Sequence, residues 1–156
     1  MNAYDKATQL LKIRSHYSTE LARKLSLRGF TKLDIEEAIN QLTEQGLLND
    51  AEYAQAYTEE LIRNKLFGFY GLKAKLMQRG IDSRDAEKLL KENLPVETET
   101  EIALRVVDRN NDLEKIKLAQ KLARKGFRSE VITTVINSFL PTSWFFLESA
   151  GGCRRV

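Results

Sequence analysis

Cysteine and histidine, which supply most disulfides and many metal sites, are nearly absent from this chain. Its 156 residues include one cysteine, Cys153, and one histidine, His16. A single cysteine cannot form an intramolecular disulfide, and these two residues are too few to provide the ligands of a structural zinc site. We therefore expect a metal-free protein, and the low cysteine content favours a cytoplasmic location.

Proline and long apolar runs are also scarce. The chain has two prolines, and 42% of its residues are hydrophobic against 30% that are charged, a balance typical of a soluble, largely helical protein. No apolar run approaches the length of a membrane span and the N-terminus lacks a signal-peptide pattern, so we expect no membrane association. The net charge of +3 is too small to indicate a polyanionic partner by itself.

Motifs of enzymatic chemistry are missing as well. His16 is followed by Tyr17 and Ser18, and no Gly-rich phosphate loop, Gly-x-Ser-x-Gly turn or recognisable acid pair accompanies it. We interpret His16 as a local capping or surface residue. The sequence predicts a protein that is not an enzyme, with no catalytic residue and no cofactor.

What the chain does contain is one phrase repeated three times, Leu-x-x-Lys-Leu-x-x-basic-Gly-apolar. The phrase occupies residues 21–30, 72–81 and 118–127, and its glycines are 51 and 46 residues apart. This spacing is typical of helical repeat arrays. Units of this length bury little apolar surface alone, so neighbouring units are expected to complete one another's core.

Each unit is predicted to contain three helices. In the first unit, Ser18 is expected to cap the second helix and Gly29 to end it. Thr31 and Asp34 have the spacing of a capping box at the start of the third helix. Asp50 is expected to cap the first helix of the second unit.

The later units repeat this plan. Gly68 and Gly71 are expected to bracket the turn before the second helix of the second unit. We predict nine helices and no strand, in an all-α fold of three tandem three-helix repeats that form an elongated, curved array. The expected repeats are residues 1–49, 50–95 and 96–140, followed by a C-terminal tail at 141–156.

The tail departs from the repeat pattern after Pro141 and holds the only tryptophan, Trp144. We expect its aromatic residues to pack on the last unit or the tail to fray, with a partner-docking segment as the alternative.

Basic residues are concentrated in the second helix of each unit. Residues 21–33, 61–81 and 115–129 contain no aspartate or glutamate. The lysine of each phrase lies four residues before the basic residue that precedes the glycine, and like charges at this spacing cost about 0.2–0.5 kcal/mol per pair. The helix dipole favours a cation in the last turn, but it does not account for the lysine one turn earlier.

We therefore predict that the second helices carry a basic edge that binds phosphates or an acidic protein surface. A structural alternative is that these long side chains cover the apolar seam with their methylene groups. The predicted binding residues of this basic edge are Arg23, Lys24, Arg28, Lys73, Lys75, Arg79, Lys117, Lys121, Arg124 and Lys125.

Three segments carry a family likeness: residues 14–30, residues 70–81, and the sequence Gly-Leu-Leu-Asn-Asp-x-x-Tyr-Ala-x-x-Tyr at 46–57. Together they resemble the RecX family of recombination regulators over residues 7–140, with the third unit matching more weakly. The resemblance implies three tandem three-helix repeats that bind the RecA filament on DNA, in its helical groove, and usually inhibit ATP hydrolysis and strand exchange. It further implies a role in recombination, DNA repair and the SOS response, with the basic edge contacting RecA or DNA.

Two other functions remain open. The first is autonomous binding of single- or double-stranded DNA by a helix-turn-helix arrangement, although the helix after the turn carries Asp34, Glu36 and Glu37, which would face phosphates unfavourably. The second is an adaptor for an acidic protein partner. In each case we expect the chain to act as a monomer.

Overall fold

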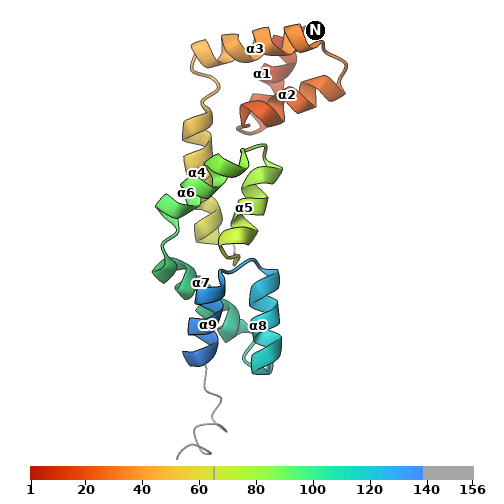
Figure 1. Cartoon of the computed structure of the whole chain (residues 1–156). Coiled ribbons are helices and arrows are strands. Elements are labelled where there is room, and N and C mark those ends of the chain that lie inside the picture. The colour runs from red at the N-terminus through yellow and green to blue at the C-terminus, as the bar shows by residue number, and fades with distance from the viewer. Residues whose placement is uncertain (65, 139–156) are drawn as a thin grey trace, which may run out of the picture. The chain divides into compact units, whose positions relative to one another are not determined.

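A computed structural model describes residues 1–64 and 66–138 of the chain (Figure 1). These residues form nine α-helices and no strand, so the predicted all-helical class is confirmed. The predicted tail at 141–156, with Trp144 and Cys153, lies outside the described residues. The helices are α1 (Ala3–Ile13), α2 (Ser18–Leu27), α3 (Lys32–Glu44), α4 (Asp50–Asn64), α5 (Phe69–Gln78), α6 (Ser83–Asn93), α7 (Val96–Arg109), α8 (Lys115–Arg124) and α9 (Ser129–Ser138).

By their contacts these helices fall into two compact units. Unit 1 comprises Met1–Lys65 and Gly71–Pro95, and unit 2 comprises Leu66–Tyr70 and the residues from Val96 onward. Unit 2 therefore takes the start of α5 from the second predicted repeat. Among the residues that the structure describes, no helix is long and apolar enough to cross a bilayer.

The repeated phrase is the C-terminal cap of the second helix in each repeat. Gly29 has a φ of +87°, its N–H bonds to the Ser26 carbonyl at 3.0 Å, and the Phe30 N–H bonds to the Leu25 carbonyl at 3.3 Å. These two bonds define a Schellman motif, in which a residue in the left-handed region ends the helix. The same pair of bonds recurs at Gly80 and Gly126, so the spacing of the phrase is set by local backbone geometry.

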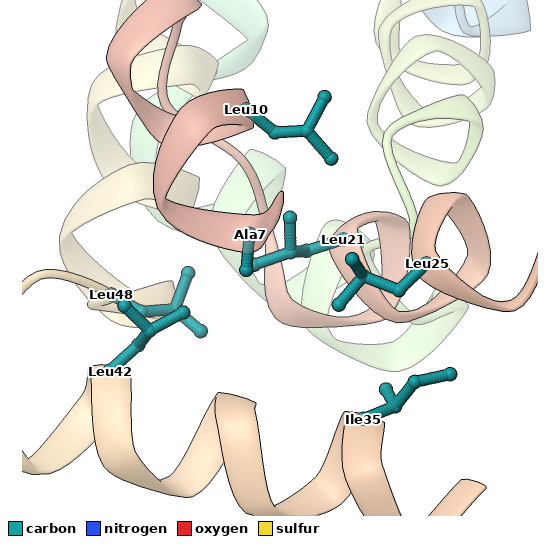
Figure 2. Packing of buried hydrophobic residues seen from close by; sticks show 7 residues of the cluster. All are labelled: Ala7, Leu10, Leu21, Leu25, Ile35, Leu42 and Leu48. Atoms are coloured by element: carbon teal, nitrogen blue, oxygen red, sulfur yellow. The ribbon is translucent and has the colours of Figure 1, made fainter. Parts of the chain in front are cut away.

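The leucines of the phrase are core residues. In unit 1, Leu21 and Leu25 project from α2 between α1 and α3 (Figure 2). Both are fully buried, and burial of a leucine side chain stabilises a fold by about 1.5–3 kcal/mol. The cluster that Figure 2 shows consists of Ala7, Leu10, Leu21, Leu25, Ile35, Leu42 and Leu48.

Two of the predicted helix caps are wrong. Ser18 is the first residue of α2, and Tyr17 holds the cap position without a side-chain bond. Asp50 lies inside α4, whose N-terminus is capped by Asn49, the Oδ1 of which accepts from the Glu52 N–H at 3.2 Å. Asp50 is displaced from its expected role because its carboxylate accepts the Ser18 N–H at 2.7 Å and the Ser18 hydroxyl.

Other expected ends are partly right. Thr31 Oγ1 accepts from the Asp34 N–H at 3.2 Å, which confirms the cap of α3. Gly71, by contrast, lies within the first turn of α5 and not in the preceding loop, because that helix begins at Phe69. The turn before α5 therefore ends at Gly68.

In unit 2 a carboxylate of α7 plays the role that Asp50 plays in unit 1. Glu99 is fully buried, and its Oε1 accepts the Phe69 N–H at 3.0 Å and the Arg128 N–H at 2.9 Å. The Arg128 guanidinium donates to Glu99 Oε2. In both units, therefore, the first helix of one predicted repeat satisfies an N–H at the start of the preceding repeat's second helix, which would otherwise lack a partner.

Candidate interface on the second helices

The structure divides the predicted basic edge between the two units. Unit 1 holds the members on α2 and at the C-terminal part of α5, and unit 2 holds those on α8. Four members are exposed, namely Arg23, Arg28, Lys117 and Arg124. Six are only partly exposed, namely Lys24, Lys73, Lys75, Arg79, Lys121 and Lys125.

Most of the partly exposed members have partners within the fold. Lys73 Nζ lies 3.4 Å from Glu87 Oε2, and Lys121 Nζ donates to Asn110 Oδ1 at 2.8 Å. Lys125 Nζ lies 4.8 Å from the centre of the Phe67 ring, within the range of a cation–π contact. Burial of these side chains against the fold leaves less of the basic edge available to a partner than the sequence suggests.

The helix dipole predicts that the basic residue at the end of each second helix contacts the last carbonyls of that helix. Arg28 does so, and Arg79 does not. Arg28 Nη1 donates to the Lys24 carbonyl at 2.8 Å, one of the carbonyls that the end of α2 leaves without a helical partner. Arg79, at the corresponding position after α5, turns instead toward α4, where its Nε donates to the Tyr57 hydroxyl at 3.3 Å.

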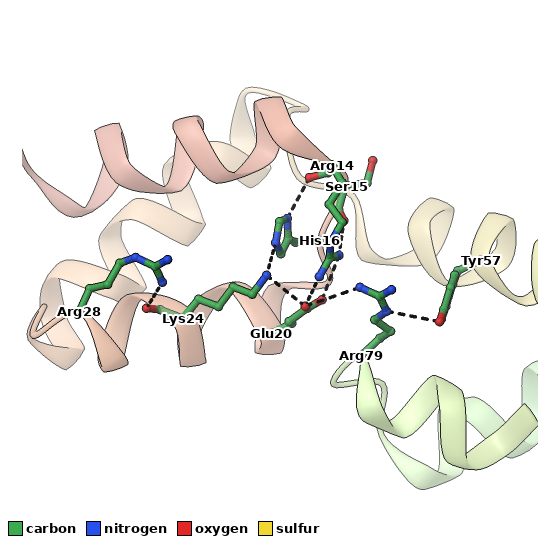
Figure 3. Close-up of polar contacts among 8 residues, drawn as sticks. All are labelled: Arg14, Ser15, His16, Glu20, Lys24, Arg28, Tyr57 and Arg79. Carbon is green, nitrogen blue, oxygen red and sulfur yellow. Dashed lines mark hydrogen bonds and ion pairs between the residues drawn. The ribbon is translucent and has the colours of Figure 1, made fainter. Parts of the chain in front are cut away.

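A cation cluster gathers around Glu20 in unit 1 (Figure 3). The Glu20 side chain is 5% exposed and forms ion pairs with Arg14, with Lys24 at 3.4 Å and with Arg79 at 3.9 Å. Arg14 follows α1, Lys24 belongs to α2 and Arg79 follows α5. We define Arg14, Lys24, Arg79 and Glu20, with the adjoining His16, as the Glu20 cluster.

Electrostatics keep the carboxylate of this cluster ionised. Burial acts to raise the pKa of Glu20, but the hydrogen bond from Arg14 and the charges of Arg14 and Lys24 outweigh it, so the pKa lies below its ordinary value. A buried carboxylate without such partners would be strongly destabilising. The cations that pair with Glu20 therefore stabilise the fold, in addition to adding positive charge to the surface.

His16 is buried, with 3% of its surface exposed, so its interpretation as a surface residue is wrong. Its Nδ1 lies 2.9 Å from the Arg14 carbonyl and its Nε2 lies 2.8 Å from Lys24 Nζ. A carbonyl only accepts and an ammonium only donates, which assigns the proton to Nδ1 and leaves Nε2 as the acceptor. Burial, the largest cause, lowers the pKa of His16, and the charges of Arg14 and Lys24 lower it further against the opposing bond to the Arg14 carbonyl.

Sequence reasoning named two of these residues, Lys24 and Arg79, as members of the basic edge. It attributed Arg79 to the helix dipole and left Lys24 without a structural explanation, whereas in the structure both pair with Glu20. Arg14 and Glu20 were missed. Their signal is weak: an acid that directly precedes the first buried leucine of the phrase, with cations six residues before it and four residues after it.

A row of tyrosines adjoins the Glu20 cluster. The rings of Tyr53 and Tyr57 stack with their centres 5.7 Å apart, and the ring centres of Tyr17 and Tyr53 are 6.3 Å apart. A groove of about 360 Å³ borders Tyr53 and Tyr57, and its walls include His16 and most of the segment 46–57. The most specific part of the family likeness thus lines one surface feature of unit 1.

Known proteins resemble this chain over most of its length. The "Regulatory protein RecX" of Chlorobaculum tepidum is 32% identical over 144 residues, which cover 89% of this chain and 89% of the relative. The "Regulatory protein RecX" of Caldanaerobacter subterraneus subsp. tengcongensis is 31% identical over 137 residues, which cover 86% of this chain and 69% of the relative. The chain belongs to the RecX family.

Two further matches agree with the RecX assignment. Residues 49–90 match the domain described as "RecX, second three-helix domain". The "Crystal structure of RecX from Lactobacillus salivarius" superimposes with a TM-score of 0.75 at 26% identity, covering 86% of this chain and 92% of that one. The RecX resemblance inferred from the sequence is therefore confirmed.

Proposed function

We propose that this RecX family protein regulates the RecA recombinase by binding in the groove of the RecA filament on DNA and inhibiting ATP hydrolysis and strand exchange. The basic edge on α2, α5 and α8 supplies the contacts. The single observation that carries the proposal is that residues 21–33, 61–81 and 115–129 of this RecX family chain, which hold α5, α8 and all of α2 from Leu21 onward, contain no acidic residue. The one acid of the second helices, Glu20, is buried in the first turn of α2. The relatives are named regulatory proteins, which agrees with binding rather than catalysis.

Within the basic edge, three residues are best placed to meet a partner. Arg23, Lys117 and Arg124 are exposed, and none of them forms an ion pair with any residue that the structure describes. Their charges are not neutralised locally, so contact with an anionic surface releases their counterions and loses no internal contact.

Readout of DNA bases by the helix after the turn is disfavoured. Asp34, Glu36 and Glu37 are exposed on α3, where they would repel phosphates along a groove. The filament is therefore a better candidate partner than one duplex sequence.

The test is the DNA-dependent ATPase of RecA, titrated with this protein. Inhibition is expected to saturate with protein bound along the filament. Replacement of Arg23, Lys117 and Arg124 by glutamate is expected to raise the concentration for half-inhibition roughly tenfold or more, because three attractive contacts become repulsive.

The matched control replaces three exposed cations outside the second helices, Lys12, Lys88 and Arg105, by glutamate. Both variants change the net charge equally, and each set includes one last-turn cation, Arg124 or Lys12. Equal loss of inhibition in both variants would mean that net charge, and not the position of these three cations on the second helices, determines inhibition. No change in ATPase, filament lifetime or strand exchange with the unaltered protein would refute the proposal, and binding to an acidic protein alone would favour the adaptor function.

A further inference from the structure

The Glu20 cluster contains more positive charge than its fold requires. Arg14, Lys24 and Arg79 all pair with the Glu20 carboxylate. The two bonds of the His16 ring fix the imidazole in its neutral form. One negative charge therefore faces three positive charges. Two unit charges remain uncompensated within the cluster, and like charges gathered this closely repel one another unless an anion joins them.

The excess charge is accessible from solvent. Glu20 is 5% exposed, whereas the side chains of Arg14, Lys24 and Arg79 are 35%, 28% and 34% exposed. The carboxylate thus holds the three cations from the inside, and part of each cationic side chain is exposed. Figure 3 shows the three side chains converging from separate segments of the chain.

Hydrogen-bond donors remain on these cations. Lys24 Nζ has three N–H groups and contacts His16 and Glu20. Arg79 Nε bonds to the Tyr57 hydroxyl, while its Nη1 is 3.9 Å from Glu20, too long for a strong hydrogen bond. A guanidinium and an ammonium with donors to spare, both paired with Glu20 Oε1, match the oxygens of a phosphate group.

We propose that the Glu20 cluster is a phosphate-binding site that receives the backbone of single-stranded DNA. This assignment rests on the proposed function for its choice of ligand, since a filament on DNA presents such a backbone. A chain of phosphates fits better than a single ion, because Arg23 and Arg28 extend the exposed positive charge along α2 in the same unit. The cluster supplies a built contact point, and the exposed arginines supply additional charge.

The first measurement is the affinity of the isolated full chain for a fluorescein-labelled, single-stranded oligonucleotide of mixed sequence, at several salt concentrations. Arg79→Gln is expected to weaken binding about tenfold, as expected for the loss of a charge-assisted contact. The slope of log affinity against log salt is expected to fall by about 0.7 for the one phosphate that is no longer neutralised. Arg79→Lys keeps the charge and is expected to recover most of the affinity.

The control is Lys91→Gln. Lys91 lies in the same unit and pairs with Glu87 at 3.0 Å, and Lys73 pairs with the same carboxylate. The loss of Lys91 therefore removes the same charge outside the Glu20 cluster and leaves Glu87 with a partner. Arg79 has the longest of the three contacts to Glu20, so Arg79→Gln should fold as the unaltered chain does. Circular dichroism checks this, and Lys24→Gln serves as a second variant.

His16 provides a readout that a general charge effect would not move. It is the only histidine in the chain, and its Nε2 contacts Lys24 at 2.8 Å, so its imidazole NMR signals report on this cluster alone. We expect these signals to shift when the oligonucleotide is added, and to shift less in Arg79→Gln than in Lys91→Gln.

The assignment is overturned if the chain does not bind the oligonucleotide, or if both variants bind equally and the His16 signals stay unchanged. A parallel titration with inorganic phosphate distinguishes the source of the anion: displacement of the oligonucleotide at equal concentration would assign the site to free phosphate instead. The RecA ATPase is measured separately, so loss of oligonucleotide binding with retained inhibition would refute this site and leave the proposed function intact.

Discussion

At the scale of single residues, one imidazole connects the backbone that follows α1 to a lysine of α2. His16 donates to the Arg14 carbonyl, which follows α1, and accepts from Lys24 on α2. Its neutral form is the only form that satisfies both bonds, because a protonated imidazole would place an N–H against the lysine ammonium. The histidine thus orients Lys24 toward Glu20.

This arrangement predicts that the stability of unit 1 falls as the pH falls below neutrality. The pKa of His16 is lowered from 6.5 in the folded chain, so below pH 6.5 the unfolded chain binds more protons than the folded chain does. The free energy of unfolding then decreases as pH decreases. The pKa of Glu20 is also lowered, from 4.5, so a second loss follows as the pH falls below 4.5.

The measurement is urea unfolding, followed by circular dichroism, at a series of pH values from neutral to acidic. His16→Gln removes the upper titration, since an amide can donate to the carbonyl and accept from Lys24 without titrating in this range. It should flatten the decrease that begins near pH 6.5 and leave the one that begins near pH 4.5. An unaltered profile in His16→Gln would show that His16 does not control the upper step.

At the scale of helices and turns, the glycines of this chain serve two different purposes. Gly29 has a φ of +87° and open space around its missing side chain, so only backbone conformation requires glycine there. Gly68 has an ordinary backbone, but a Cβ would lie 2.2 Å from Phe127 Cα and 2.5 Å from Phe127 N. Close approach of two backbones requires glycine at Gly68, and its N–H bonds to the Lys125 carbonyl at 3.0 Å.

We therefore expect alanine to be much more damaging at Gly68 than at Gly29. Gly29→Ala should cost about 1–2 kcal/mol, the price of a left-handed backbone for a residue with a Cβ. Gly68→Ala forces the two backbones apart and breaks the bond to Lys125, which should exceed that cost and lower the amide protection of Tyr70, whose N–H bonds to Gly126. Thermal unfolding and hydrogen exchange test the order, and an equal effect at both positions would contradict it.

Local features of these elements could be predicted from the sequence, and long-range ones could not. The ends of α2, α5 and α8 followed from the phrase because a Schellman motif involves only neighbouring residues. The partner of Ser18 is Asp50, 32 residues away, and no local pattern reveals it. The basic edge shows the same limit: its charges were visible in the sequence, but the pairing of Lys24 and Arg79 with one buried carboxylate was not.

At the scale of the whole molecule, the compact units do not coincide with the predicted repeats. The division into residues 1–49, 50–95 and 96–140 follows the sequence period and stays a prediction. Contacts instead assign Leu66–Tyr70 to the unit that begins again at Val96. Hydrogen bonds as well as apolar contacts hold this segment in unit 2. The N–H groups of Gly68 and Tyr70 donate to the Lys125 and Gly126 carbonyls, and the Phe69 N–H donates to Glu99.

Unit 2 should therefore depend on this short segment. A fragment of residues 96–156 lacks residues 66–70. In that fragment the fully buried Glu99 would lose the Phe69 N–H, and the Lys125 and Gly126 carbonyls would lose their donors. Each buried polar group without a partner costs about 1–3 kcal/mol. A fragment of residues 66–156 retains the segment and should hold the Arg128 amide, which donates to Glu99 at 2.9 Å, in a slowly exchanging state.

Hydrogen exchange of the Arg128 amide in the two fragments and in the full chain tests this dependence. We expect similar protection in the full chain and in residues 66–156, and much faster exchange in residues 96–156. Glu99→Gln in the longer fragment is the control, because it weakens the ion pair with Arg128 while keeping the segment present. Equal protection in both fragments would mean that the third repeat completes its own core, and the boundary at residue 96 would then be a structural one as well as a sequence one.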